Sequence, residues 1–180
     1  MPKELRNQTD RTPLDRVDRA LVALLQQNAR LSNKQLAARV GLAESSTLAR
    51  VRRLEERGVL RGYHAEVAPW AVGIGLQALV AVRLSRHARD VVERFQHHCR
   101  ALPQVLAAYN IGGTDDFLVH VGVEDSDALR ELILSSISTR PEVTHIETHL
   151  IFDMVRGAAA VGATAAVELR ASADRHSAGS

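Results

Sequence analysis

The stretch 44–58 combines small hydroxyl side chains with arginines at a spacing that suits nucleic-acid binding. At 100° per residue, Ser46, Arg50 and Arg53 fall on one side of a predicted helix, opposite its apolar residues. Small polar side chains in the first turn of such a helix can reach base edges, and the arginines that follow can bind phosphates. A solvated helix surface would explain the arginines alone equally well, so the prediction of DNA binding rests on the whole stretch. The candidate DNA contacts are Asn33, Lys34, Ser45, Ser46, Thr47, Arg50, Arg52, Arg53, Arg57 and Arg61.

A shorter helix must hold this one in place. Ser32 and Gln35 have the spacing of a capping box, in which the two side chains satisfy backbone amides at the start of a helix. Gly41 offers the left-handed conformation that ends a helix, and the next helix follows at once from Glu44. Two short helices joined by a tight glycine turn, the second one basic, predict a helix-turn-helix. A preceding amphipathic helix completes a three-helix unit through Leu14, Val17, Leu21, Leu24 and Leu25.

The residues after this unit predict a wing and then a hinge. Residues 58–67 are bounded by glycine and carry β-branched and aromatic side chains, which favour a short strand or hairpin. A winged variant of the helix-turn-helix is therefore expected, and Arg61 could touch a phosphate from the wing. Residues 68–75 contain one proline and two glycines and predict the boundary between two domains. We expect Trp70 to pack against the interdomain surface.

The second part of the chain predicts the order strand, helix, strand, strand, helix, strand. This is the order of a ferredoxin-like βαββαβ fold, an antiparallel four-stranded sheet with both helices on one face. The fold class is therefore α+β. Apolar residues such as Leu79 and Leu118 on the opposite sheet face predict that another subunit covers it. The predicted strands are 76–84, 105–111, 117–123 and 143–152, the predicted helices are 88–102 and about 126–137, and the predicted core residues include Val80, Val82, Val119 and Val121.

Composition restricts the class of protein. The chain has 180 residues, 46% of them hydrophobic and 24% charged, which suits a globular protein of two domains. Residues 1–66 hold 13 Lys/Arg against 8 Asp/Glu, while the remainder holds 10 against 13, so the positive charge lies with the helix-turn-helix. A single cysteine, Cys99, excludes an intrachain disulfide. With no apolar leader and no long apolar run, we expect a cytoplasmic protein without a membrane partner.

One group of side chains could bind a metal. His145, Glu147 and His149 alternate along the last predicted strand and share one face, and imidazole suits zinc, nickel or copper. A polar strip at a sheet edge or interface explains them as well, because a period of two does not make side chains converge. The sequence leaves this site open. We expect no cofactor, and no phosphate-binding glycine loop, nucleophile elbow or paired cysteine motif is present.

Several stretches together resemble the leucine-responsive/AsnC (feast/famine) family of transcription regulators. They are 14–18, 36–42, 50–55 and Gly58 with Gly62-Tyr63, and the resemblance covers about residues 14–155. The family implies a winged helix-turn-helix, a ligand-sensing ferredoxin-like domain, dimers formed through the sensing domains and assembly to an octamer. We therefore expect a flexible arm over 1–13, a DNA-binding domain over 14–67, a hinge over 68–75, an effector-binding and oligomerisation domain over 76–156, and an Ala/Gly/Ser-rich, partly disordered tail over 157–180.

The resemblance also implies an effector site. The family's Gly-Asp-x-Asp-aromatic signature is similar to residues 113–117, with Thr114 where an Asp is common. An amino-acid effector would need an acceptor such as Asp116 for its ammonium, and donors such as the Gly113 amide for its carboxylate. An ordinary glycine-rich hairpin remains the alternative. The candidate effector contacts are Gly112, Gly113, Thr114, Asp115, Asp116 and Phe117.

The expected function is sequence-specific DNA binding by a transcription regulator, not an enzyme, whose assembly or DNA affinity responds to an amino acid. Its expected partners are double-stranded DNA, the effector and further copies of the chain. Two alternatives stay open: an enzyme similar to siroheme decarboxylases, which resemble this family in both domains, and an architectural DNA-binding protein without an effector. The sequence does not decide which amino acid binds, which genes are controlled, or whether control is by activation or repression.

Overall fold

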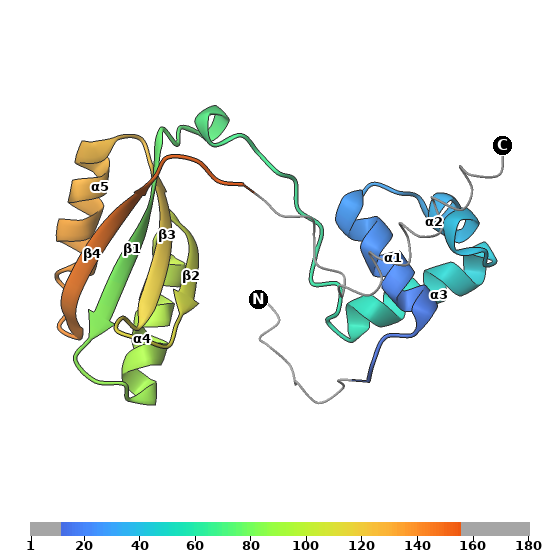
Figure 1. Ribbon diagram of the computed structural model, residues 1–180, viewed down its shortest axis with the longest axis horizontal. Coiled ribbons are helices and arrows are strands. Elements are labelled where there is room, and N and C mark those ends of the chain that lie inside the picture. Colours follow the sequence, from blue (N-terminus) through green and yellow to red (C-terminus); the bar gives the residue numbers. More distant parts are fainter. Residues whose placement is uncertain (1–11, 156–180) are drawn as a thin grey trace, which may run out of the picture. The chain divides into compact units, whose positions relative to one another are not determined.

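The computed structural model describes residues 12–155, which divide into two compact units, one ending at Ala65 and the other spanning Glu66–Val155 (Figure 1). The expected hinge over 68–75 is attached to the second unit. It contains the short helix η1 (Pro69–Val72), and the Gly75 amide donates to the Val123 carbonyl at 3.0 Å. Trp70 was expected to be packed but is largely exposed. The tail expected over 157–180 and most of the expected arm lie outside the described residues.

The first unit is the expected three-helix unit. Ser32 and Gln35 form both halves of the predicted capping box, and Gly41 ends the following helix with a φ of 69°. Asp15 caps the first helix by accepting from the Asp18 amide at 2.7 Å. These caps fix where the helices begin and turn, as the sequence predicted. The helices are α1 (Arg16–Gln27), α2 (Asn33–Val40) and α3 (Glu44–Glu56), and their buried core is Leu21, Leu25, Leu36 and Leu54.

The buried face of α3 differs from the predicted one. The apolar residue Leu48 is exposed, whereas Thr47, one of the candidate DNA contacts, is fully buried. The Thr47 hydroxyl donates to the Ala43 carbonyl at 3.1 Å, so the helix backbone satisfies this polar group and it can enter the core. The rotation of α3 also carries Arg50 from the predicted outer face to the edge of the contact with α1.

The strand or hairpin predicted over 58–67 is not formed. Of the residues that the structure describes, those from Arg57 to Ala68 carry no strand, and most of them are exposed. Gly62 has a φ of 149°, and the Tyr63 hydroxyl donates to Glu55 of α3 at 2.9 Å. Among residues 12–155 no strand pairs with this segment, and a single strand without a partner makes no ladder.

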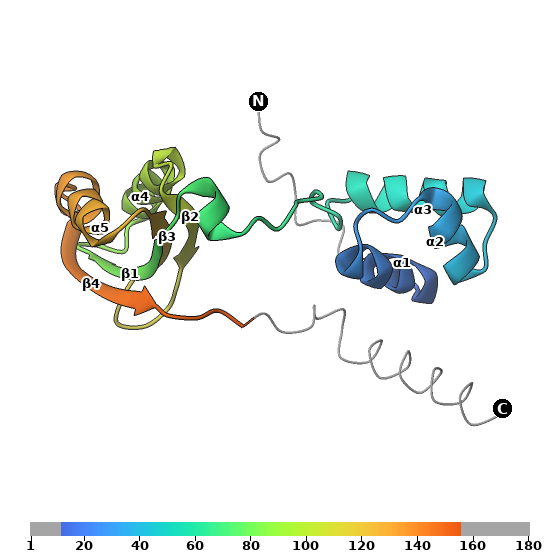
Figure 2. The ribbon, with the colours of Figure 1, turned by 90° about the horizontal axis from the view of Figure 1, so that it is seen from above.

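The second unit is the predicted ferredoxin-like fold. Its four strands follow the order β2-β3-β1-β4, and every neighbouring pair is antiparallel. Figure 2 shows α4 and α5 on the same side of this sheet. The elements are β1 (Leu76–Leu84), α4 (Arg89–Ala101), β2 (Val105–Asn110), β3 (Phe117–Val123), α5 (Ser126–Leu132), the π-helix η2 (Ile133–Ile137) and β4 (Val143–Ile151).

The core of this unit lies between the sheet and its helices. Phe95 of α4 packs on Phe117 of β3 with their ring centroids 4.9 Å apart. Leu79 and Leu118 lie on the opposite sheet face and stay partly exposed, as expected for a face that another subunit could cover. No helix within residues 12–155 is both long enough and apolar enough to cross a bilayer. The predicted core residues Val80, Val82, Val119 and Val121 are all fully buried.

Candidate functional site: the recognition helix and the β2–β3 loop

The first turn of α3 is an exposed polar surface. Ser45 and Ser46 are exposed there, and Arg52 is exposed nearly two turns further along. Lys34, in the first turn of α2, is exposed as well. The Asn33 side-chain amide donates to the Glu44 carbonyl at 2.8 Å and so ties the start of α2 to the start of α3. Asn33 therefore helps to fix the angle between the two helices.

Arg50 and Arg53 hold α3 to α1. Arg50 NH1 lies 2.8 Å from Asp18 Oδ1 and 2.5 Å from Asp15 Oδ2, and Arg53 NH2 lies 2.7 Å from Asp18 Oδ2. Asp18 is only 2% exposed, whereas Arg50 is 29% and Arg53 51% exposed. The hydrogen bond from the Asp18 amide, followed by the one from Arg50, lowers the pKa of Asp15. We call these four side chains the α1–α3 seam.

Sequence reasoning missed Asp18. The helical periodicity of α3 placed the arginines by their angle around the helix axis alone. The available signal was a carboxylate on the apolar side of α1, because a buried carboxylate needs a basic partner. The three remaining candidate DNA contacts differ in exposure and in their partners. Thr47 is buried, Arg57 donates to the Thr12 carbonyl at 2.6 Å, and Arg61 is exposed after α3.

The β2–β3 loop is held by an arginine that the sequence did not single out. Arg83 of β1 donates through Nε to the Thr114 carbonyl at 2.8 Å, and its NH2 lies 3.3 Å from Asp115 Oδ1. Gly113 has a φ of 137°, a conformation that favours glycine, and a Cβ there would meet open space. Gly112, Gly113 and Thr114 are exposed. The loop thus presents backbone amides to solvent while β1 fixes its far end.

The acidic end of the loop is buried. Asp116 is 4% exposed; its Oδ2 accepts from the Leu84 amide at 2.7 Å, and its Oδ1 lies 2.5 Å from His87 Nδ1. Phe117 is in the core and anchors the start of β3. The six candidate effector residues are therefore contiguous but differ in exposure: the glycines and Thr114 at one end are exposed, and the carboxylate of Asp116 at the other end is covered.

The histidines of β4 show no metal cage. His149 Nε2 lies 3.8 Å from Glu147 Oε1, and both side chains are more than half exposed. Within residues 12–155, no group of three or more histidine, cysteine or carboxylate side chains is arranged to hold a metal ion.

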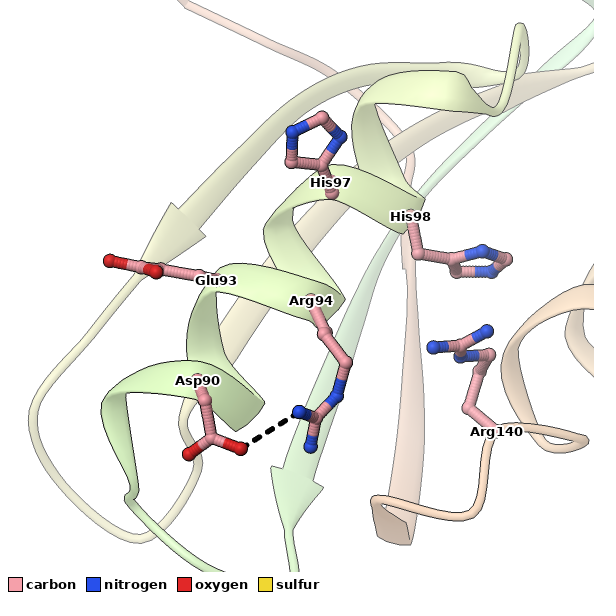
Figure 3. A pocket seen from close by; sticks show the side chains of 6 residues that line it. All are labelled: Asp90, Glu93, Arg94, His97, His98 and Arg140. Atoms are coloured by element: carbon pink, nitrogen blue, oxygen red, sulfur yellow. Dashed lines mark hydrogen bonds and ion pairs between the residues drawn. The ribbon is translucent and has the colours of Figure 1, made fainter.

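A cleft of about 550 Å³ lies beside α4 (Figure 3). Its charged groups find partners within the subunit. Arg94 lies 2.8 Å from Asp90, Arg140 lies 2.7 Å from Glu142, and His98 Nε2 lies 2.7 Å from the Ser136 carbonyl. The cleft therefore shows no unpaired charge that would require a ligand. Its lining residues are Asp90, Glu93, Arg94, His97, His98 and Arg140.

Comparison with known proteins assigns both units. Residues 14–61 match the winged helix-turn-helix DNA-binding family model, and residues 77–160 match the Lrp/AsnC ligand binding domain. The HTH-type transcriptional regulator AldR of Mycolicibacterium smegmatis is 40% identical over 157 residues, covering 87% of this chain and 90% of that protein. The leucine-responsive regulatory protein of Escherichia coli is 34% identical over 143 residues, covering 79% of this chain and 87% of that protein.

A solved structure of a transcriptional regulator from Neisseria meningitidis in complex with L-Met has a TM-score of 0.73 and 31% identity, covering 81% of this chain and 94% of that one. These matches and the two units define a DNA-binding transcription regulator with a ligand-binding domain, not an enzyme. The chain belongs to the Lrp/AsnC family.

Proposed function

We propose that this regulator acts in the cytoplasm, reads double-stranded DNA with the first turn of α3, and changes its assembly or DNA affinity when a free amino acid binds the β2–β3 loop. The observation that carries the effector proposal is the composition of that loop. The exposed residues Gly112 and Gly113 bring backbone amides and the following Asp115 and Asp116 bring carboxylates to one loop, so both ends of a zwitterion could find partners of the right kind there. The L-Met complex of the Neisseria relative supports this choice of ligand class.

The structure changes how the basic residues are assigned within this proposal. Ser45 and Ser46 reach base edges from the first turn of α3, and Lys34 and Arg52, which are exposed at the start of α2 and in the second half of α3, bind phosphate. Arg50 acts as a positioning residue, since two carboxylates hold its guanidinium.

DNA binding is tested with an operator selected from a random-sequence duplex library. The Arg52→Ala variant should bind this operator more weakly, with a salt dependence reduced by about one unit of slope, because one phosphate contact is lost. Arg130→Ala removes the same charge from an exposed position on α5 and should change neither quantity. Equal affinities for both variants would contradict the proposed surface. Ser46→Ala should instead change the preference among operators, by about 1–3 kcal/mol for a good base contact.

Effector binding is tested by thermal shift against the twenty amino acids, because a ligand of the folded state raises the melting temperature by mass action. Thr114→Val removes one exposed donor and should weaken binding several-fold, whereas Thr148→Val on β4 should not. Asp116→Ala would also leave the buried Leu84 amide without its acceptor, so Asp116→Asn is the cleaner variant. A chain that binds DNA but responds to no amino acid would favour an architectural protein.

Self-assembly is the third part of the proposal. The sheet face that carries Leu79 and Leu118 is proposed to pair with a second copy, and further assembly to an octamer is expected from the family resemblance. Leu118→Glu places a charge on this face, on one of the two inner strands, and should shift the protein toward the monomer in analytical ultracentrifugation. Glu147→Gln on the same face removes a charge and serves as the control. An unchanged sedimentation profile for Leu118→Glu would move the dimer contact elsewhere.

A further inference from the structure

The Asp116 carboxylate has two partners, one at the end of β1 and one in the connection between β1 and α4. The Leu84 amide donates to Oδ2 at 2.7 Å, and His87 Nδ1 lies 2.5 Å from Oδ1. Asp116 is almost fully buried. An effector ammonium that approaches this carboxylate therefore meets oxygens that are already in use.

The two partners differ in how easily they can leave. The Leu84 amide is a buried backbone donor at the point where the register between β1 and β4 shifts, so losing its acceptor would be costly. The His87 side chain is 78% exposed, and its imidazole can turn into water at little cost in buried area. Of the two contacts to Asp116, only the one to His87 can be exchanged cheaply.

The segment that carries His87 is free to make this movement. At one end the Ser85 amide donates to the Glu142 carbonyl at 2.8 Å, and at the other the Ala88 carbonyl accepts from Val91 and begins α4. Arg86 and His87 lie between these anchors and are exposed. The imidazole can therefore leave Asp116 without moving β1 or α4.

We infer that His87 is a displaceable cap on Asp116, which the ammonium of the effector replaces. This inference rests on the proposed effector function of the β2–β3 loop. The exchange favours a ligand with a free ammonium, because a charge-assisted hydrogen bond to a carboxylate is stronger than one from a neutral donor. The cap also lowers the apparent affinity, which equals the intrinsic affinity multiplied by the fraction of molecules in which the carboxylate is uncovered.

The test is calorimetric titration of the full-length wild type, His87→Ala and His97→Ala with L-methionine and, separately, with each of the other nineteen amino acids. His97 is a matched control, because it is also an exposed histidine of the same unit, on α4. His87→Ala should bind about three- to tenfold more tightly than the wild type, the range expected for the loss of a single hydrogen bond from an exposed donor. His97→Ala should bind like the wild type. The deaminated acid of the same side chain should gain nothing from His87→Ala.

The outcomes separate this inference from the function on which it rests. If the wild type binds an amino acid and His87→Ala binds it equally or more weakly, the cap is refuted and the effector site stands. If none of the three proteins binds any amino acid, the proposed effector function fails and the cap fails with it. A melting temperature of His87→Ala close to that of the wild type verifies that the variant is folded. The variant His87→Phe cannot form a hydrogen bond to Asp116, so it must show the same gain in amino-acid affinity as His87→Ala.

Discussion

Replacing Asp18 by alanine tests the α1–α3 seam most directly. Asp18 is nearly inaccessible to solvent and accepts from both Arg50 and Arg53. Its removal deletes two charge-assisted contacts between helices that are far apart in sequence. We expect the DNA-binding unit to be destabilised while the sensing unit is not.

The magnitude follows from the exposure of the partners. Breaking a fully buried ion pair by removing one member costs about 3–5 kcal/mol. Here Arg53 is half exposed and Arg50 keeps Asp15, so both guanidinium groups can find water or another carboxylate after the change. Solvent screening reduces the cost further. We therefore expect a loss of about 2–3 kcal/mol for Asp18→Ala.

Hydrogen exchange measured by mass spectrometry gives the free energy of opening for each helix in the full chain. A loss of about 2–3 kcal/mol corresponds to a fall in amide protection of roughly 30- to 150-fold in α1 and α3. Arg16→Ala changes an exposed charge on the same helix and should leave protection unchanged. A fall of less than about threefold for Asp18→Ala would refute the seam as a stabilising contact.

Three further predictions concern the caps and the titratable groups. Ser32→Ala breaks one half of the capping box and should lower the stability of α2 by about 1 kcal/mol, measured by hydrogen exchange. The pKa of Asp15 is lowered in the folded chain, so its stabilisation is complete above the unfolded value of 3.8 and is lost as the pH falls through the folded value; Asp15→Asn should flatten the loss of α1 protection below about pH 4. Burial raises the pKa of the Cys99 thiol to about 11, so at pH 8 the native chain should react with a disulfide reagent at least about 100-fold more slowly than the chain in urea.

The fold could be predicted because its signals are local. The capping residues Ser32 and Gln35 and the terminator Gly41 fix helix ends through hydrogen bonds between near neighbours in sequence. Alternating residues in the strands likewise fix which side chains enter the core, and Val80 and Val119 are buried as expected. The prediction of a strand over 58–67 was wrong because a strand needs a pairing partner, and the local sequence does not specify that partner.

The candidate site could be predicted in position but not in detail. The turn-forming residues 112–116 mark the loop, yet nothing local shows that Arg83 holds it or that His87 reaches Asp116. These contacts join residues about 30 positions apart, so they depend on the antiparallel pairing of β1 with β3. The available signal for these contacts was the presence of ionisable residues, Arg83 and His87, near the end of β1. Their partners follow only once the strand register is known.

The contacts also distinguish the arginines of α3 from one another. Arg50 has contacts to two carboxylates and is mostly covered, so its guanidinium is committed to holding α1. Arg53 commits one amino group to Asp18 and leaves more than half of its side chain exposed, and a guanidinium carries five donors. It can therefore hold the seam and donate to a phosphate at the same time. Arg52 contacts solvent and is free to bind DNA. Angular position on a helical wheel cannot separate these roles, because the difference lies in where the carboxylates of α1 meet the helix.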